Sequence, residues 1–262
     1  MGIAIGCVNE KELLNDLDRA IANDEFILHY QIKYDLKTDE PIGAEVLVRW
    51  MHPYYWYLSP EKFIPLFERE CVINKLDIYV AKRVCKELKE IRKYKPNFRL
   101  SFNISRQGFS DKKTIDEIIK KIEESGLPKD SIEMELTETG FLSGNKEQIL
   151  IKECKYLSEK GFCLAIDDFG CGFSSLCLLK DIDIDTLKLD RNFLIDNSSK
   201  SMTIVKGVVN LAKSLNIKIV AEGIETKEMY DFVKEIGCDY AQGYYLSKPI
   251  EYNEFLEKFI LN

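Results

Sequence analysis

The feature of this 262-residue chain that most limits its fold is a regular alternation of two kinds of segment. Apolar, β-branched runs of strand length alternate with amphipathic segments of helical length. The expected strands are 26–36, 44–50, 99–105, 132–138, 162–169, 186–190, 218–224 and 241–247. The expected helices are 75–94, 114–125, 146–161, 201–216, 227–237 and 251–260, and another short helix over about 10–23 precedes the first strand.

From the third strand onward, strand and helix alternate without a Pro/Gly/Ser-rich linker, which predicts right-handed crossovers and a parallel sheet. A single α/β barrel takes about 250 residues, so this chain has the right length for one. No Gly-rich dinucleotide fingerprint follows the first strand, which argues against an open nucleotide-binding sheet. We therefore expect an α/β fold, a TIM-like (β/α)8 barrel over about 26–260, in a single domain covering 1–262.

The start of the predicted barrel departs from this regular order. Only the heptapeptide KTDEPIG separates the first two strands, and a parallel crossover needs a dozen or more residues. One antiparallel strand near the N-terminal hairpin is therefore expected. The helix over about 10–23 is expected to plug or cap the barrel floor.

Composition excludes several classes of function. The chain has 44 acidic and 37 basic residues, a net charge of −7, so a broad basic surface for DNA or RNA is not expected. His29 and His52 are too few for a His-based zinc site or a Ser-His-Asp triad. The eight cysteines form no CxxC pair, which favours reduced thiols and a cytoplasmic location. No apolar run is long enough for a membrane segment.

Polar residues recur where the expected strands end. They are Glu45 and Arg49, Asn103, Glu135 and Glu138, Asp167 and Asp168, Lys188 and Asp190, Glu222 and Glu225, and Gln242. The carboxyl ends of parallel barrel strands meet at one mouth, where enzymes of this fold carry their chemistry. Carboxylates 4 Å apart repel by about 4 kcal/mol at an effective dielectric near 20, so cations are expected among them. Oxygen ligands with no His or Cys favour magnesium or manganese.

The adjacent acids Asp167 and Asp168 suit a pair of ions, because a strand that turns into a loop can direct both side chains inward. Two ions about 3.5–4 Å apart serve in-line attack of water on a phosphodiester. Arg49 and Lys188 would then contact phosphate oxygens. Taken singly, each acid could instead be a helix cap or a solvated turn residue, and Lys188 could belong to a polar barrel layer. Their recurrence on several strands favours the metal and phosphate site.

A set of ordered motifs now identifies a family. They are EVLVRWMHP, with Glu45-Val46-Leu47, then SFNIS, ELTET, IDDFGCGFSSL, DTLKLDRNF, IVAEGIET and AQGYYLSKP. From about Leu13 to Phe259 the chain resembles the EAL-domain phosphodiesterases, which hydrolyse the bacterial second messenger cyclic di-GMP. The resemblance implies cleavage of one phosphodiester to linear 5′-pGpG with two Mg²⁺ or Mn²⁺ ions, inhibition by Ca²⁺, and a homodimer.

The resemblance also assigns roles to individual residues. The metal positions are Glu45, Asn103, Glu135, Asp167, Asp168 and Glu222, with Asp190 close by. The catalytic residues are Glu222 as a general base, Lys188 beside the attacking water or the scissile phosphate, and Glu45. The substrate-binding residues are Gln31, Leu47, Arg49, Gln242 and Asp190. The loop-stabilising residues are Glu138 and Glu225, of which Glu138 holds the loop 167–175.

The chain departs from the family pattern in the segment HPYYWYLSP (52–60), where Trp56 stands at a position that is usually Gly. One ring of this aromatic loop could stack on a guanine, or the loop could pack on the barrel rim or on a neighbour. Two other functions stay open: a cyclic di-GMP receptor without turnover, and a protein-interaction module. Family members are usually fused to sensory or diguanylate cyclase domains, which become partners if this chain is a fragment.

Overall fold

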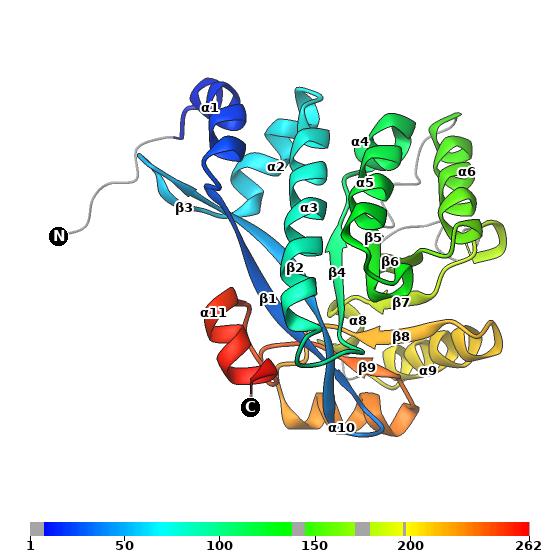
Figure 1. The fold of residues 1–262 in the computed structure, drawn as a ribbon. Helices are drawn as coiled ribbons and strands as arrows, with labels where there is room; N and C mark the ends of the chain where they lie inside the picture. The colour runs from blue at the N-terminus through cyan, green and yellow to red at the C-terminus, as the bar shows by residue number, and fades with distance from the viewer. Residues whose placement is uncertain (1–7, 138–144, 171–178, 196–197, 262) are drawn as a thin grey trace.

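The computed structural model describes residues 8–137, 145–170, 179–195 and 198–261, and its strands and helices alternate as expected (Figure 1). The strands are β1 (Phe26–Asp35), β2 (Glu40–His52), β3 (Trp56–Leu58), β4 (Arg99–Asn103), β5 (Ile132–Thr137), β6 (Cys163–Phe169), β7 (Thr186–Leu189), β8 (Lys218–Ala221), β9 (Tyr240–Ala241) and β10 (Ile250–Glu251). The longer helices are α1 (Glu10–Ala22), α2 (Pro60–Arg69), α3 (Ile73–Ile91), α5 (Lys112–Ser125), α6 (Asn145–Glu159), α9 (Ser199–Ser214) and α10 (Lys227–Ile236). The shorter ones are α4 (Arg106–Ser110), α8 (Asn192–Ile195), α11 (Tyr252–Phe255), the 3₁₀ helix Lys129–Ser131 and the π-helix Leu256–Ile260.

The sheet closes into a barrel in which eight strands follow the order β1-β9-β8-β7-β6-β5-β4-β2, and β2 pairs back onto β1. Each neighbouring pair from β2 through β9 is parallel. Strand β1 is antiparallel to both of its barrel neighbours, β2 and β9. The TIM-like barrel with one antiparallel strand at the N-terminal hairpin is therefore confirmed.

Helix α1 lies at the opposite end of the barrel from the one expected. It packs outside the end of β2, where Asp16 Oδ2 lies 3.0 Å from His52 Nε2 and Glu12 accepts a hydrogen bond from Tyr55. Figure 1 shows α1 beside α2, far from the turn that joins β1 to β2. The prediction that it plugs or caps the floor is wrong. Strand β1 runs against the other strands, so the helix that leads into it starts at the mouth end.

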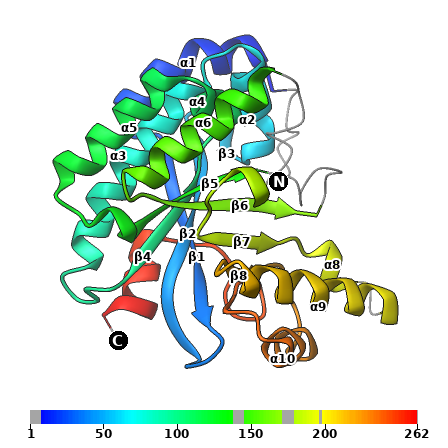
Figure 2. The ribbon, with the colours of Figure 1, turned by 90° about the vertical axis from the view of Figure 1, so that its right-hand side faces the viewer.

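The barrel strands direct apolar side chains outward and polar ones inward. On β5, Ile132, Met134 and Leu136 are buried in the apolar core, whereas the alternate residues Glu133 and Glu135 form hydrogen bonds inside the barrel. Figure 2 shows α3, α5 and α6 along the outside of these strands. The apolar core is therefore the layer between strands and helices, and the barrel interior is left for charged groups.

Several short elements differ from the expected ones. The aromatic segment after β2 forms the short antiparallel strand β3, and α2 and α4 were not expected. The last expected strand, 241–247, stops at Ala241, because the chain then turns: Leu246 N and Ser247 N both donate to the carbonyl of Gly243. Gly243 packs against the backbone of Ile224, where a side chain would not fit. Within the described part of the chain, no helix combines the length and the apolar character needed to cross a bilayer.

A buried carboxyl outside the barrel makes stability depend on pH. Asp77 on α3 accepts hydrogen bonds from Ser105 Oγ at 2.6 Å and Ser105 N at 3.3 Å. Burial raises the pKa of Asp77 to about 7, against the opposing effect of these bonds. The unfolded chain loses this proton near its ordinary pKa, so the fold loses stability as pH rises from about 4 to about 7.

We expect Asp77→Asn to remove this dependence. The free energy of unfolding of the variant, relative to the wild type, should rise with pH across that window by at most about 4 kcal/mol. Urea unfolding at about pH 4 and about pH 8 measures the difference. A difference that is the same at both pH values would contradict the assignment.

Candidate active site

One buried ammonium group organises the mouth of the barrel. Lys188 on β7 is 1% exposed and has carboxylates on several sides. Its Nζ lies 3.1 Å from Glu45 Oε2, 2.7 Å from Glu135 Oε2, 3.1 Å from Asp167 Oδ1 and 2.9 Å from Glu222 Oε1. These four acids come from β2, β5, β6 and the residue after β8, so the closed barrel is what brings them together.

The pKa values of these groups show how the charges compete. Burial would lower the pKa of Lys188, but Asp167, Glu135 and the other acids outweigh it and raise that pKa well above its usual value. Burial and neighbouring carboxylates raise the pKa of Glu222 well above its ordinary value, despite Lys188. The pKa of Glu45 is raised for the same reasons. The raised pKa values of Glu222 and Glu45 show that the nearby positive charge does not fully compensate these acids, so the site favours further positive charge.

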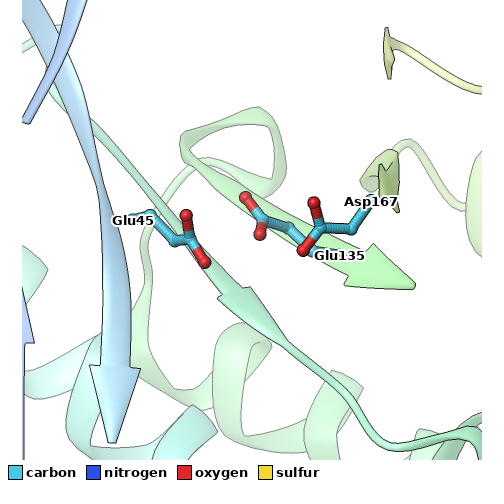
Figure 3. A group of neighbouring side chains, drawn as sticks. All are labelled: Glu45, Glu135 and Asp167. Atoms are coloured by element: carbon cyan, nitrogen blue, oxygen red, sulfur yellow. The ribbon is translucent and has the colours of Figure 1, made fainter. Parts of the chain in front are cut away.

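The acids form two groups in which oxygen atoms from different residues come within 4.8 Å of one another. Glu45, Glu135 and Asp167 make up the first, which Figure 3 shows converging from three strands. Asp167, Asp168 and Glu222 make up the second. Asp167 therefore belongs to both, as expected for a carboxylate between two ions.

The backbone explains how two successive acids reach one site. Asp168 has a φ of 55°, in the left-handed region that non-glycine residues rarely adopt. The pairing of β6 with β7 shifts register between Ile166 and Phe169. In a regular strand, successive side chains point to opposite faces. This irregularity lets Asp167 and Asp168 line the same cavity.

Amide side chains fix the orientation of Glu45. Asn103 Nδ2 donates to Glu45 Oε1 at 3.0 Å, and Gln242 Nε2 donates to Glu45 Oε2 at 2.6 Å. Gln242 Nε2 also donates to Gln31 Oε1, while Gln31 donates to the carbonyl of Ser247. Among the described residues, the buried Gln242 Oε1 has no hydrogen-bond partner. Gln242 Oε1 could accept a hydrogen bond from a metal-bound water. Together with the carboxylate oxygens, it fits a site for hydrated Mg²⁺ or Mn²⁺.

The mouth cavity, of about 270 Å³, contains most of the remaining predicted site residues. Leu47 and Asp190 line it, and Asp190 Oδ1 accepts a hydrogen bond from Asn192 N at 2.8 Å. Glu225 also lines it and lies 3.4 Å from Arg191. Glu138 and residues 171–175 of the expected loop lie outside the described residues.

Arg49 lies in a neighbouring cavity that shares Leu47 with the mouth. Its Nε donates to Tyr57 Oη and its Nη1 to the carbonyl of Val48, both at 2.8 Å. Within the aromatic loop, Tyr57 therefore contacts a predicted substrate-binding residue. Trp56 is 72% exposed and has a φ of 58°, which explains why glycine suits this position.

Lys33 on β1 is a charged interior residue that the sequence analysis missed. It is 5% exposed, and its Nζ lies 3.0 Å from Glu135 Oε1. The same strand position looks solvent-facing in the segment FILHYQIKYDL, because polar and apolar residues alternate there. Lys33 lies two residues after Gln31, a predicted substrate-binding residue, so both face the same side of the strand. This spacing is the sequence signal that could have identified Lys33 as an interior residue.

Comparison with known proteins agrees with this geometry. A family model described as the EAL domain matches residues 14–249. The chain belongs to the EAL domain family. The family resemblance inferred from the motifs is confirmed.

Named relatives and a solved structure share this family. The chain is 34% identical to the cyclic di-GMP phosphodiesterase NbdA of Pseudomonas aeruginosa, over 95% of this chain and 32% of that protein. It is 35% identical to the probable cyclic di-GMP phosphodiesterase PdeG of Escherichia coli, over 94% of this chain and 48% of that protein. The structure of the PaMucR phosphodiesterase in complex with c-di-GMP is similar, with a TM-score of 0.85, 31% identity and coverage of 94% of this chain and 100% of that one. The chain thus spans about a third to a half of these two curated relatives.

The two acidic groups predict stabilisation by Mn²⁺. We expect Mn²⁺ at about one hundred times its dissociation constant to raise the free energy of unfolding by about 2.7 kcal/mol per site. Asp167→Asn should lose most of this gain, because Asp167 belongs to both groups. Thermal and urea unfolding with and without Mn²⁺ measure it.

Asp116→Asn is the matched control, since Asp116 lies on α5 and pairs with Lys112. It should respond to Mn²⁺ as the wild type does. An equal Mn²⁺ response in Asp167→Asn and the wild type would contradict the shared position of Asp167.

Proposed function

We propose that the chain is a cyclic di-GMP phosphodiesterase that opens one phosphodiester of its substrate, with two Mg²⁺ or Mn²⁺ ions, to give linear 5′-pGpG. The observation that carries this proposal is the pair of acidic groups that share Asp167 around the Lys188 ammonium. Relatives over nearly the whole chain bear the name cyclic di-GMP phosphodiesterase, which supplies the substrate class.

The ligands of the first ion would be Glu45, Asn103, Glu135 and Asp167, and those of the second Asp167, Asp168 and Glu222, with Asp190 beside them. Bound ions of this kind lower the pKa of water and compensate phosphate charge. Glu45, held by Asn103 and Gln242, keeps a fixed orientation toward the cavity. The acids together offer the oxygen ligands that hard cations prefer.

Three side chains would act on substrate and water. Glu222 lines the cavity beside Lys188 and would act as a general base that accepts a proton from the attacking water. Lys188 stays charged in this site and would stabilise negative charge at the reacting phosphate. Arg49, held by Tyr57 and Val48, presents its remaining N–H groups for a phosphate oxygen. Gln31, Leu47 and Gln242 would line the bound dinucleotide.

The decisive experiment is hydrolysis of cyclic di-GMP with Mg²⁺ or Mn²⁺. We expect linear 5′-pGpG from the wild type and a loss of at least about 100-fold in kcat for Glu45→Gln, the size typical of one lost electrostatic contact. Glu117→Gln, on the exposed face of α5, is the matched control and should keep full activity. Binding without product would instead indicate a receptor, and neither binding nor product an interaction module.

We expect Ca²⁺ to inhibit this reaction. Ca²⁺ takes about 6–8 oxygen ligands at about 2.3–2.6 Å, whereas Mg²⁺ requires near-octahedral geometry at about 2.0–2.1 Å. Ca²⁺ would therefore bind to the same acids but would not position the attacking water and the phosphate for the reaction. Initial rates at fixed Mg²⁺ should fall with added Ca²⁺ and recover with excess Mg²⁺. Turnover supported by Ca²⁺ alone would contradict this reading.

The assembly belongs to the proposal as well. We infer a homodimer from the family, whose contact region includes a loop at 167–175 that lies partly outside the described residues. We also infer that Glu138 and Glu225 stabilise that loop. The protein is inferred to be cytoplasmic. Sensory or diguanylate cyclase domains are expected partners, since the chain matches only part of its relatives' length.

A further inference from the structure

A second buried lysine lies beneath the acids at the mouth. Lys33 follows Gln31 by two residues on β1, so both side chains face the barrel interior. Its Nζ donates to Ser101 Oγ at 2.7 Å, Glu133 Oε2 at 3.2 Å and Glu135 Oε1 at 3.0 Å. Three acceptors match the three hydrogens of an ammonium group, which fixes its position.

Glu135 is held by ammonium groups at both ends of its carboxylate. Lys33 Nζ contacts Glu135 Oε1 at 3.0 Å, and Lys188 Nζ contacts Glu135 Oε2 at 2.7 Å. The side chain of Glu135 is fully buried. Glu135 is therefore held at both carboxylate oxygens within the first acidic group.

The space below Lys33 shows why Glu135 needs this support. A cavity of about 630 Å³ lies at the barrel floor, lined by Lys33, Ser101, Glu133 and residues around them. This floor cavity lies on the opposite side of the site from the mouth cavity. Lys33 lines the floor cavity but not the mouth cavity. Without the lysine, the Glu135 carboxylate would keep Lys188 and the Ser101 side chain as partners but would lose the ammonium group that holds Oε1 on the side of this cavity.

We propose that Lys33 is a positioning residue for metal binding, which holds Glu135 in the orientation that the first ion requires. The proposal builds on the two-metal function above. A positioning role and a simple charge effect predict opposite changes in cation affinity when Lys33 is removed. If Lys33 acted only through its charge, its removal would strengthen cation binding, because a nearby positive charge repels a cation. If it positions Glu135, its removal weakens cation binding.

The test is the dissociation constant of Mn²⁺ measured directly on the metal-free protein by electron paramagnetic resonance of free Mn²⁺. Lys33→Met should weaken Mn²⁺ binding by about 10- to 100-fold, the range typical when a partner of a metal ligand is lost. Lys33→Gln, whose amide can still donate to Glu135, should show a smaller loss. Unchanged or tighter binding in both variants would overturn the proposal.

Glu133→Gln is the matched control, because Glu133 also contacts Lys33 but belongs to neither acidic group. It should bind Mn²⁺ within about threefold of the wild type, well inside the loss expected for Lys33→Met. Equal losses in Glu133→Gln and Lys33→Met would point to general disruption of the floor and count against a specific role. A wild type that fails to bind Mn²⁺ would refute the proposed function itself. If Lys33→Met does not fold, the Mn²⁺ dissociation constant of Lys33→Gln relative to the wild type shows whether loss of the lysine weakens or strengthens binding.

Discussion

The contact of one buried ammonium group with four carboxylates is the interaction on which this structure depends. Lys188 and its partners are taken out of water, which costs several kcal/mol per ion unless each charge is closely paired. The pairing is possible only if strands far apart in sequence bring their ends to one point. The charge cluster therefore requires the barrel closure, and loss of Lys188 would leave Glu45, Asp167 and Glu222 without their shared ammonium partner.

The same constraint explains why the barrel is polar inside and apolar outside. Glu133, Glu135 and Lys33 fill interior positions that branched apolar residues usually occupy in barrels of this type. Their strand neighbours, such as Met134 and Ile32, are buried in the apolar core. Stability thus comes mainly from the layer between strands and helices, and the interior serves the site.

The sequence predicted the strand order and the ring of acids because both follow from periodicity. It failed where tertiary contacts decide: α1 is amphipathic in either location, and only the reversed direction of β1 places it at the mouth. Helix α2 was missed because Pro65 lies inside it, although Pro60 at its first turn is a favourable start. Lys33 was missed because a lysine in an alternating strand looks solvent-facing unless its two-residue spacing from the inward Gln31 is considered.

The balance of charge at the mouth links cation binding to substrate binding. Without bound cations, the carboxylates at the mouth outnumber the ammonium groups of Lys188 and Lys33, and a phosphodiester would be repelled. Two divalent cations reverse that sign. Under the proposed function, the cations must therefore be present before an anionic dinucleotide binds well. Arg49, held at the rim by Tyr57, adds directed donors, but it cannot replace this reversal because it lies in the neighbouring cavity. A chain with a net charge of −7 can in this way bind an anion at a site built from carboxylates.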